Sequence, residues 1–175
     1  MKKIFAVILV IAALFSFSGC MGAGTSVVKA TDPADPSKIV YKDYDCNLEG
    51  LCNYLDDLGY MVFDYDASKD EAGTATIKMQ ADMIGAEKGY KSGYNYGNDK
   101  WTVEAYYYKD TSSDMYKEAQ SGKITLTEEI DNGSFEITVN NQFALVVHEP
   151  KDGGERKEEI IEAFNNFYPD GTPNG

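Results

Sequence analysis

The chain has 175 residues, of which 16 are basic and 29 acidic, and its formal charge at pH 7 is −13. A field of that sign repels phosphate groups, which excludes nucleic acid as a partner and disfavours binding to anionic lipid headgroups. Cations, basic proteins and neutral ligands such as glycans remain as classes of partner.

The first nineteen residues differ in composition from the rest of the chain. Lys2 and Lys3 give a positive start, and residues 4–17 are apolar except for Ser16. A helix of that length extends only about 21 Å, whereas the hydrocarbon core of a bilayer is about 30 Å thick. A positive start and a short apolar run followed by small residues are typical of an export signal. We therefore predict that residues 1–19 are a cleaved leader.

The segment Phe17-Ser18-Gly19-Cys20 resembles the lipobox of bacterial lipoproteins. Ser18, Gly19 and Cys20 match that pattern, whereas Phe17 stands where an aliphatic residue is usual. The resemblance implies cleavage before Cys20, a diacylglyceryl group on its sulfur, and a location on the extracytoplasmic face of a cell membrane. Each buried CH₂ group of the acyl chains contributes about 0.8 kcal/mol, so two long chains anchor the protein without a further membrane-binding surface.

Two other interpretations of the leader remain open. Ser16 and Ser18 also fit an ordinary signal-peptidase site, which would release a protein that starts at Gly19. The third interpretation is an uncleaved anchor. Beyond the lipobox, the size and the order of elements resemble the small uncharacterised lipoproteins of Gram-positive bacteria, a likeness that implies no functional residue.

The 156 residues from Cys20 onward are a usual size for one domain. Loss of the two leader lysines changes the formal charge to −15. Residues 20–40 are rich in small residues and proline, which predicts a lipidated N-terminus and a flexible tether of about 25 Å. We expect one acidic α+β domain over residues 41–168 and a disordered tail over residues 169–175.

Apolar residues recur at helical spacing between residues 48 and 58, which predicts an amphipathic helix. Asp45 or Asn47 can cap the start of this helix, and Gly59 can end it. A short strand is predicted over residues 60–65.

The middle of the chain is predicted from alternation and turn composition. Residues 74–88 alternate like a strand at first but favour a short helix that ends near Gly89. Residues 90–100 are rich in Gly, Tyr and Asn and are predicted as a turn or hairpin loop. Residues 101–108 are predicted as a strand, and residues 112–121 as a helix.

The last third of the chain contains a predicted hairpin and a predicted helix. Residues 135–139 and 143–147 flank Asn140-Asn141, a dipeptide suited to a tight turn. Residues 155–167 are predicted as a helix with its apolar side on the sheet. The complete order predicts an α+β fold in which helices pack on one face of a small antiparallel sheet.

Cys46 and Cys52 follow the tether, and export would permit a disulfide between them. Two positions six apart within one helix are too distant to be bridged, so a disulfide requires a bend before the helix. A disulfide and a pair of small buried hydrophobic residues therefore both remain open. Neither a C-x-x-C motif nor a nearby histidine is present, so the sequence indicates no metal or redox site.

No catalytic or cofactor motif is evident in the chain. His148 is the only histidine, and strand alternation places it away from the predicted core. No G-x-S-x-G motif accompanies it. Residues 64–70 alternate like the ligands of a calcium loop, but Lys69 and Ala75 stand where that loop needs Gly and Glu, which leaves a solvated acidic turn or a weak surface calcium site. With 29 acidic residues, chance pairs of carboxylates do not indicate a glycosidase.

Aromatic residues concentrate between residues 90 and 108. Five of them are candidate ligand contacts because aromatic faces stack on sugar rings: Tyr94, Tyr96, Trp101, Tyr106 and Tyr108. Tyrosine also favours strands, so plain packing in a sheet is the alternative.

Three functional hypotheses follow from these observations. The first is a non-catalytic envelope lipoprotein that binds a protein partner, for which we expect an exposed apolar or aromatic patch. The second is a module that binds glycans or small ligands through the aromatic face. The third is an enzyme of unrecognised type.

Overall fold

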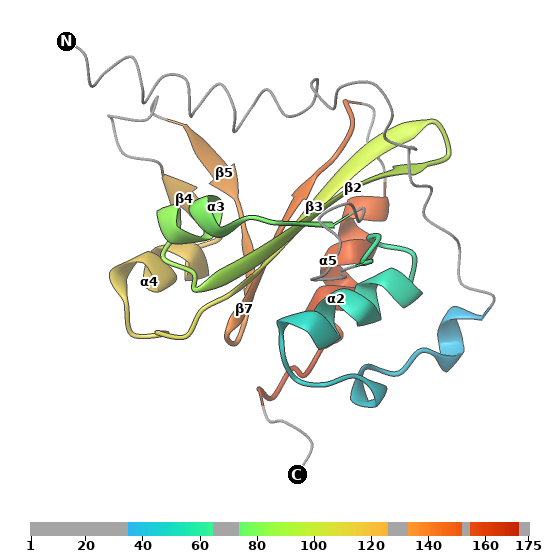
Figure 1. Ribbon diagram of the computed structural model, residues 1–175, viewed down its shortest axis with the longest axis horizontal. Helices are drawn as coiled ribbons and strands as arrows, with labels where there is room; N and C mark the ends of the chain where they lie inside the picture. Colours follow the sequence, from blue (N-terminus) through green and yellow to red (C-terminus); the bar gives the residue numbers. More distant parts are fainter. Residues whose placement is uncertain (1–34, 65–73, 126–132, 152–154, 172–175) are drawn as a thin grey trace.

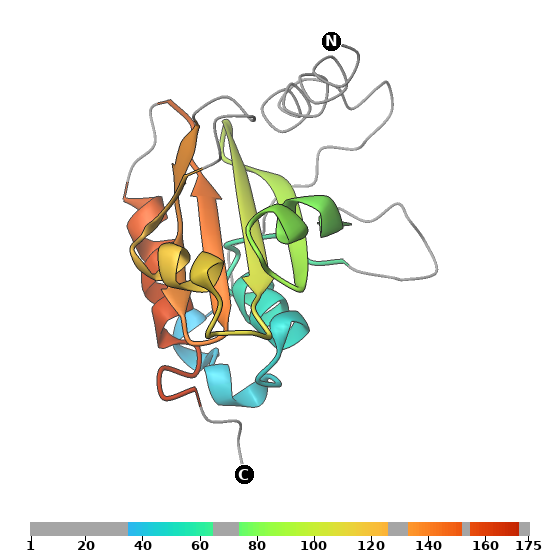
Figure 2. The same ribbon diagram turned by 90° about the vertical axis from the view of Figure 1, so that its left-hand side faces the viewer.

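The computed structural model describes residues 35–64, 74–125, 133–151 and 155–171. Its centre is a five-stranded antiparallel sheet, whose strands run side by side in Figure 2. Across the sheet the order is β1 (Thr74–Thr76), β2 (Lys88–Tyr96), β3 (Asp99–Tyr107), β7 (Phe143–His148) and β6 (Thr138–Asn140).

Two layers flank this sheet, as Figure 1 shows. One layer consists of the helices α2 (Leu48–Asp57) and α5 (Arg156–Asn166). The other contains two shorter helices and a two-stranded sheet: α3 (Lys78–Met83), α4 (Asp114–Gln120), β4 (Lys123–Thr125) and β5 (Ser134–Glu136). The 3₁₀ helices η1 (Pro36–Lys38) and η2 (Tyr41–Asp43) precede α2.

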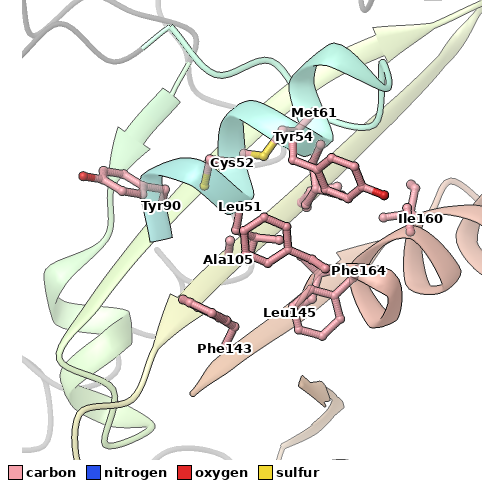
Figure 3. Packing of buried hydrophobic residues seen from close by; sticks show 14 of the residues in the cluster. Leu51, Cys52, Tyr54, Met61, Tyr90, Ala105, Phe143, Leu145, Ile160 and Phe164 are labelled. Atoms are coloured by element: carbon pink, nitrogen blue, oxygen red, sulfur yellow. The ribbon is translucent and has the colours of Figure 1, made fainter. Parts of the chain in front are cut away.

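The first core lies between the sheet and the helices α2 and α5 (Figure 3). Leu51 and Leu55 of α2 are fully buried, as the predicted helical seam requires. The Asn47 side chain accepts a hydrogen bond from the Gly50 amide and caps the helix, and Gly59 follows its end with a φ of 75°. The prediction of this helix, with one of its two proposed caps, is confirmed.

The second core lies on the opposite face of the sheet. Its members come from both short helices, from β4 and from the sheet itself, and they include Ile77, Ala81, Tyr106, Tyr116, Ala119, Ile124, Ala144 and Val146. Residues 143–146 are all buried, because this stretch of β7 is covered on both faces. The predicted α+β fold with an antiparallel sheet is confirmed, and its two longest helices share one face. The structure adds a second, shorter layer on the other face.

The Gly- and Tyr-rich segment over residues 90–100 is not a loop, contrary to our prediction. It forms most of the β2–β3 hairpin, and the turn is confined to Gly97-Asn98, with Gly97 at a φ of 62°. Gly89 is needed within the strand, because a Cβ there would lie 2.7 Å from the ring of Tyr106. Gly89 thus reflects close packing and Gly97 a tight turn, rather than a long loop.

Other boundaries also differ from the predictions. Residues 60–64 form no strand, and Phe135 lies in β5, where it pairs with Ile124 of β4 instead of with β7. Thr74–Thr76 is a strand, and the predicted short helix follows it as α3. The helix α4 begins at Asp114, two residues later than predicted, and Ser113 caps it. The leader, Cys20, residues 65–70 and the end of the tail lie outside the described residues.

Contacts with the core begin inside the segment predicted as a tether. Ile39, which follows η1, packs against the first core and is partly buried. At the other end of the domain, Tyr168 is buried and its hydroxyl donates a hydrogen bond of 2.8 Å to the Tyr44 carbonyl. The two ends of the domain are therefore joined to each other through the first core.

The β6–β7 hairpin turns at Asn141-Gln142, one residue later than the predicted Asn140-Asn141 turn, and Asn140 joins the hairpin to the end of α5. Asn141 adopts a φ of 52°, as its place in a tight turn predicts. The buried Asn140 side chain donates hydrogen bonds to the carbonyl oxygens of Phe164 and Phe167, at 2.9 and 2.6 Å. It thereby satisfies carbonyl groups that the end of a helix leaves without partners.

Replacement of Asn140 by alanine should lower the free energy of unfolding by about 1–3 kcal/mol, because the carbonyl oxygens of α5 lose their donors. Asn140→Asp should cost more at pH 7, since a carboxylate cannot donate and is repelled by those oxygens. Chemical denaturation measures both changes, with the exposed Asn165→Ala on α5 as the control. An Asn140→Ala variant within about 0.5 kcal/mol of that control would contradict the assigned role.

Candidate functional site

The aromatic residues that we proposed as a ligand-binding face belong mostly to the two cores. Tyr94 and Trp101 lie opposite each other in the β2–β3 ladder and are only 1% and 3% exposed, in the first core. Tyr106 and Tyr108 are buried in the second core, on the other side of the sheet. Only Tyr96 is partly exposed. The prediction of one exposed aromatic face is wrong, because Tyr94 and Trp101 are buried on one face of the sheet and Tyr106 and Tyr108 on the other.

Arg156 covers the partly exposed Tyr96 at the start of α5. The guanidinium carbon lies 3.4 Å from the centroid of the Tyr96 ring and 5.2 Å from that of Tyr60. The same guanidinium donates a hydrogen bond to the Gly59 carbonyl. These cation–π contacts hold α5 against the hairpin and leave little of the Tyr96 face for a ligand.

A cluster of polar side chains occupies the second face of the sheet around Glu104 in β3. Lys91 lies directly across from Glu104 in β2, and its ammonium group is 2.7 Å from Oε1. Nε2 of His148, in β7, is 3.4 Å from the same oxygen. The Tyr106 hydroxyl donates a hydrogen bond of 2.7 Å to Oε2. Side chains from three neighbouring strands therefore meet at one buried carboxylate.

The charges around Glu104 keep it ionised. Burial alone would raise the pKa of this carboxyl, but the contact with His148 and the positive charge of Lys91 outweigh burial and lower the pKa to about 2. Burial and the nearby carboxylate raise the pKa of Tyr106, so its phenol stays protonated as a donor. The cluster is thus a charged Glu104 that is held by one cation, one imidazole and one phenol.

This arrangement offers the chemistry of an oriented imidazole and little more. The His148 side chain is 50% exposed, in accordance with its predicted place away from the core. A buried carboxylate can orient an imidazole for proton transfer, but Glu104 already accepts from three groups. Among the described residues, no three His, Cys, Asp or Glu side chains are grouped so that they could hold a metal ion.

Cys46 and Cys52 are both free thiols in the structure. Cys52 is fully buried in the first core, and Cys46 is partly buried against it. Burial raises the pKa of both thiols, which keeps them protonated and weakly nucleophilic. The sequence left open a disulfide or a pair of small hydrophobic residues. The structure supports the second interpretation, because both thiols are free and pack in or against the first core.

A groove of about 460 Å³ lies between α4 and the edge strand β6. Its lining has no ionisable acid or base side chain other than a tyrosine: Tyr116, Ala119, Gln120, Gly122, Ile137, Thr138, Val139 and Asn141. The Tyr116 hydroxyl donates a hydrogen bond of 2.6 Å to the Asn141 carbonyl and closes one end. The volume is within the range of roughly 300–1,000 Å³ that ligand sites occupy.

Asp56, a further carboxyl group with a shifted pKa, lies at the C-terminal end of α2. Burial raises the pKa of this carboxyl to about 6, and the charges of Asp57 and Asp64 add to the rise, although a backbone hydrogen bond with Phe63 opposes it. A negative charge at this end also meets the negative pole of the helix dipole. Asp56 is therefore charged at an energetic cost at neutral pH.

For Glu104 we predict a loss of stability as pH falls. The folded pKa lies below the ordinary 4.5, so the charged carboxylate contributes stability above pH 4.5 that disappears as pH approaches 2. Glu104→Gln should be less stable than the wild type at pH 7 by about 2–3 kcal/mol, with a difference that shrinks between pH 4.5 and 2. Urea denaturation across this range measures the difference, with the exposed Glu158→Gln as control. A difference independent of pH would refute the assignment.

For Asp56 we predict the opposite pH dependence, in which its charge lowers the stability of the fold as pH rises. The folded pKa lies above the ordinary 3.8, so the penalty is absent below pH 3.8 and fully present above about pH 6. Asp56→Asn should therefore be more stable than the wild type at pH 7, and thermal melts should show the gap narrowing as pH falls from 6 towards 4. The exposed Asp170→Asn is the control. An Asp56→Asn variant that melts below the wild type at pH 7 would contradict this prediction.

No family model, curated protein or solved structure matches this chain.

Proposed function

We propose that this chain is a lipoprotein, anchored through Cys20 on the extracytoplasmic face of a cell membrane, whose domain binds a protein partner or assists an envelope complex without catalysis. The observation that carries the proposal is the leader, in which a positive start and a short apolar run lead directly to Ser18-Gly19-Cys20. This combination resembles the lipobox and gives the cysteine a specific chemical role.

The described domain agrees with an anchor that lies outside it. None of its helices is both long and apolar enough to cross a bilayer. Among the described residues, Ile39 is the first that packs against the core, and eighteen residues lie between it and Cys20. A flexible segment of that length spans about 25 Å, which exceeds the roughly 8 Å screening length at physiological salt, so the acidic domain is little affected by anionic headgroups.

The surface of the domain supports binding through polar groups and backbone rather than through an apolar patch. Among the described residues, the large hydrophobic side chains that are exposed are Val40 and Met79, at 44% and 46%. The apolar patch that we expected from a partner-binding protein is therefore not seen in this part of the chain. The groove beside β6 is the concave surface that supports binding, while the burial of Tyr94 and Trp101 removes the support for a glycan-binding face.

The anchor is tested by metabolic labelling of expressing cells with radioactive palmitate. The wild-type chain should carry label and sediment with membranes. Cys20→Ser should lose both properties, because the proposed diacylglyceryl group is joined to the Cys20 sulfur. Cys46→Ser, at the partly buried cysteine, should remain labelled and is the matched control. An unlabelled wild-type chain whose mature mass begins at Gly19 would instead establish ordinary secretion and overturn the proposal.

A further inference from the structure

We infer that the groove between α4 and β6 binds an extended, uncharged segment of a partner polypeptide, which adds a strand to this edge of the sheet. The inference rests on the proposed role in protein binding and deepens it, because it names the site and the chemistry of the segment that is bound.

The backbone groups of β6 alternate between the partner strand and the open edge of the sheet. Among the strands that the structure describes, β6 is the last in the sheet and pairs only with β7, with Asn140 opposite Phe143 across the two-residue turn Asn141-Gln142. In such a hairpin the closing pair exchanges its hydrogen bonds, and backbone groups at alternate residues point away from the partner strand. Ile137, Val139 and Asn141 therefore direct backbone groups towards the groove.

Each of the outer two residues already uses one of its backbone groups. The Ile137 amide donates a hydrogen bond of 3.1 Å to the Gly122 carbonyl, and the Asn141 carbonyl accepts one of 2.6 Å from the Tyr116 hydroxyl. Val139 lies between them and lines the groove. Its amide and carbonyl together form a donor and an acceptor at strand spacing, a pattern that the backbone of another extended chain matches.

The lining determines which segment fits. Gln120, Thr138 and Asn141 offer neutral polar groups, and no Asp, Glu, Lys or Arg lines the groove, although the chain as a whole carries a charge of −13. A charged side chain bound there would lose its hydration without gaining a counter-charge. Gly122 adds room, because a Cβ at this position would meet only the Ile137 carbonyl, at 4.0 Å. The groove therefore favours an uncharged segment.

The opposite edge of the sheet provides a matched control. The Ile77 amide donates to the Gly89 carbonyl, and Thr76 lies one residue before it, opposite Tyr90. By the same alternation, the Thr76 amide points outward from β1. Proline at Val139 or at Thr76 removes one outward amide from an edge strand and leaves the bonds within the ladder in place. The two variants remove an outward donor from opposite edges of the sheet, and Val139→Pro also changes a side chain that packs against the second core.

The test uses a phage library of random heptapeptides, selected against the full chain in detergent. We expect enriched, uncharged sequences that bind the wild type, bind Val139→Pro at least about tenfold more weakly and bind Thr76→Pro within about twofold. Gln120→Arg, which places a charge at the exposed rim of the groove, should weaken binding as well. This variant decides the outcome if amide spectra show that Val139→Pro is misfolded.

Hydrogen exchange adds a readout at the atom concerned. In the free protein the Val139 amide should exchange faster than the Asn140 amide, which is bonded to β7, and a selected peptide should slow Val139 at least about tenfold. The inference is overturned if no sequence is enriched, or if Val139→Pro and Gln120→Arg bind as the wild type does. Peptides that bind equally to all variants would exclude the groove as the binding site but would be compatible with protein binding elsewhere on the surface. The palmitate experiment decides separately whether Cys20 carries lipid.

Discussion

The domain depends on β3, the central strand, which is buried on both faces. Trp101, Val103 and Ala105 point into the first core, and Glu104 and Tyr106 point to the second face. The ladder with β2 runs over the full length of both strands, from Lys88 opposite Tyr107 to Tyr96 opposite Asp99. Since a slip of one residue would exchange the two faces, the packing of both layers fixes this register.

Glu104 is the exception within this strand, since a charge sits where an apolar residue would pack without cost. Its pairing with Lys91 and His148 offsets the loss of hydration, but a well-packed apolar residue is often as stable as a buried ion pair. The carboxylate also contributes to specificity, because its partners lie on both adjacent strands and are correctly placed in one register only. Ser92 acts similarly in β2, where its hydroxyl accepts a hydrogen bond of 2.9 Å from the Val62 amide and positions the chain after α2.

The parts of the fold that were predictable have local causes. The helix α2 and its Asn47 cap follow from apolar spacing and a capping residue within one short segment. Strand β2 was missed because Gly, Tyr and Asn resemble a turn in composition, whereas the alternation of Tyr90, Ser92 and Tyr94 on one face was the more informative signal. Propensity gave way here to packing, as it often does in strands.

The candidate sites were harder to predict, because their members are distant in the sequence. The place of His148 on the outer face followed from alternation, but its contact with Glu104 joins residues that are 44 positions apart. The aromatic residues were assigned to a surface because residues 90–100 were predicted as a loop, whereas they form strands that are covered on both faces. The groove combines α4, Gly122 and β6, and no motif within any of these segments indicates it.

The edge of the sheet at β6 links stability to recognition. An exposed edge invites indiscriminate pairing, and proteins limit it with short strands and covered backbone groups. Here the strand has three residues, Gly122 and Tyr116 bond the backbone on either side, and Val139 alone lies between these bonds. Asn140 fixes the strand to the end of α5, so its position is set before any partner arrives. A preorganised edge needs little ordering on binding, and one that offers a single residue cannot support extended self-association. The same features that protect this edge would therefore make it selective for one short added strand.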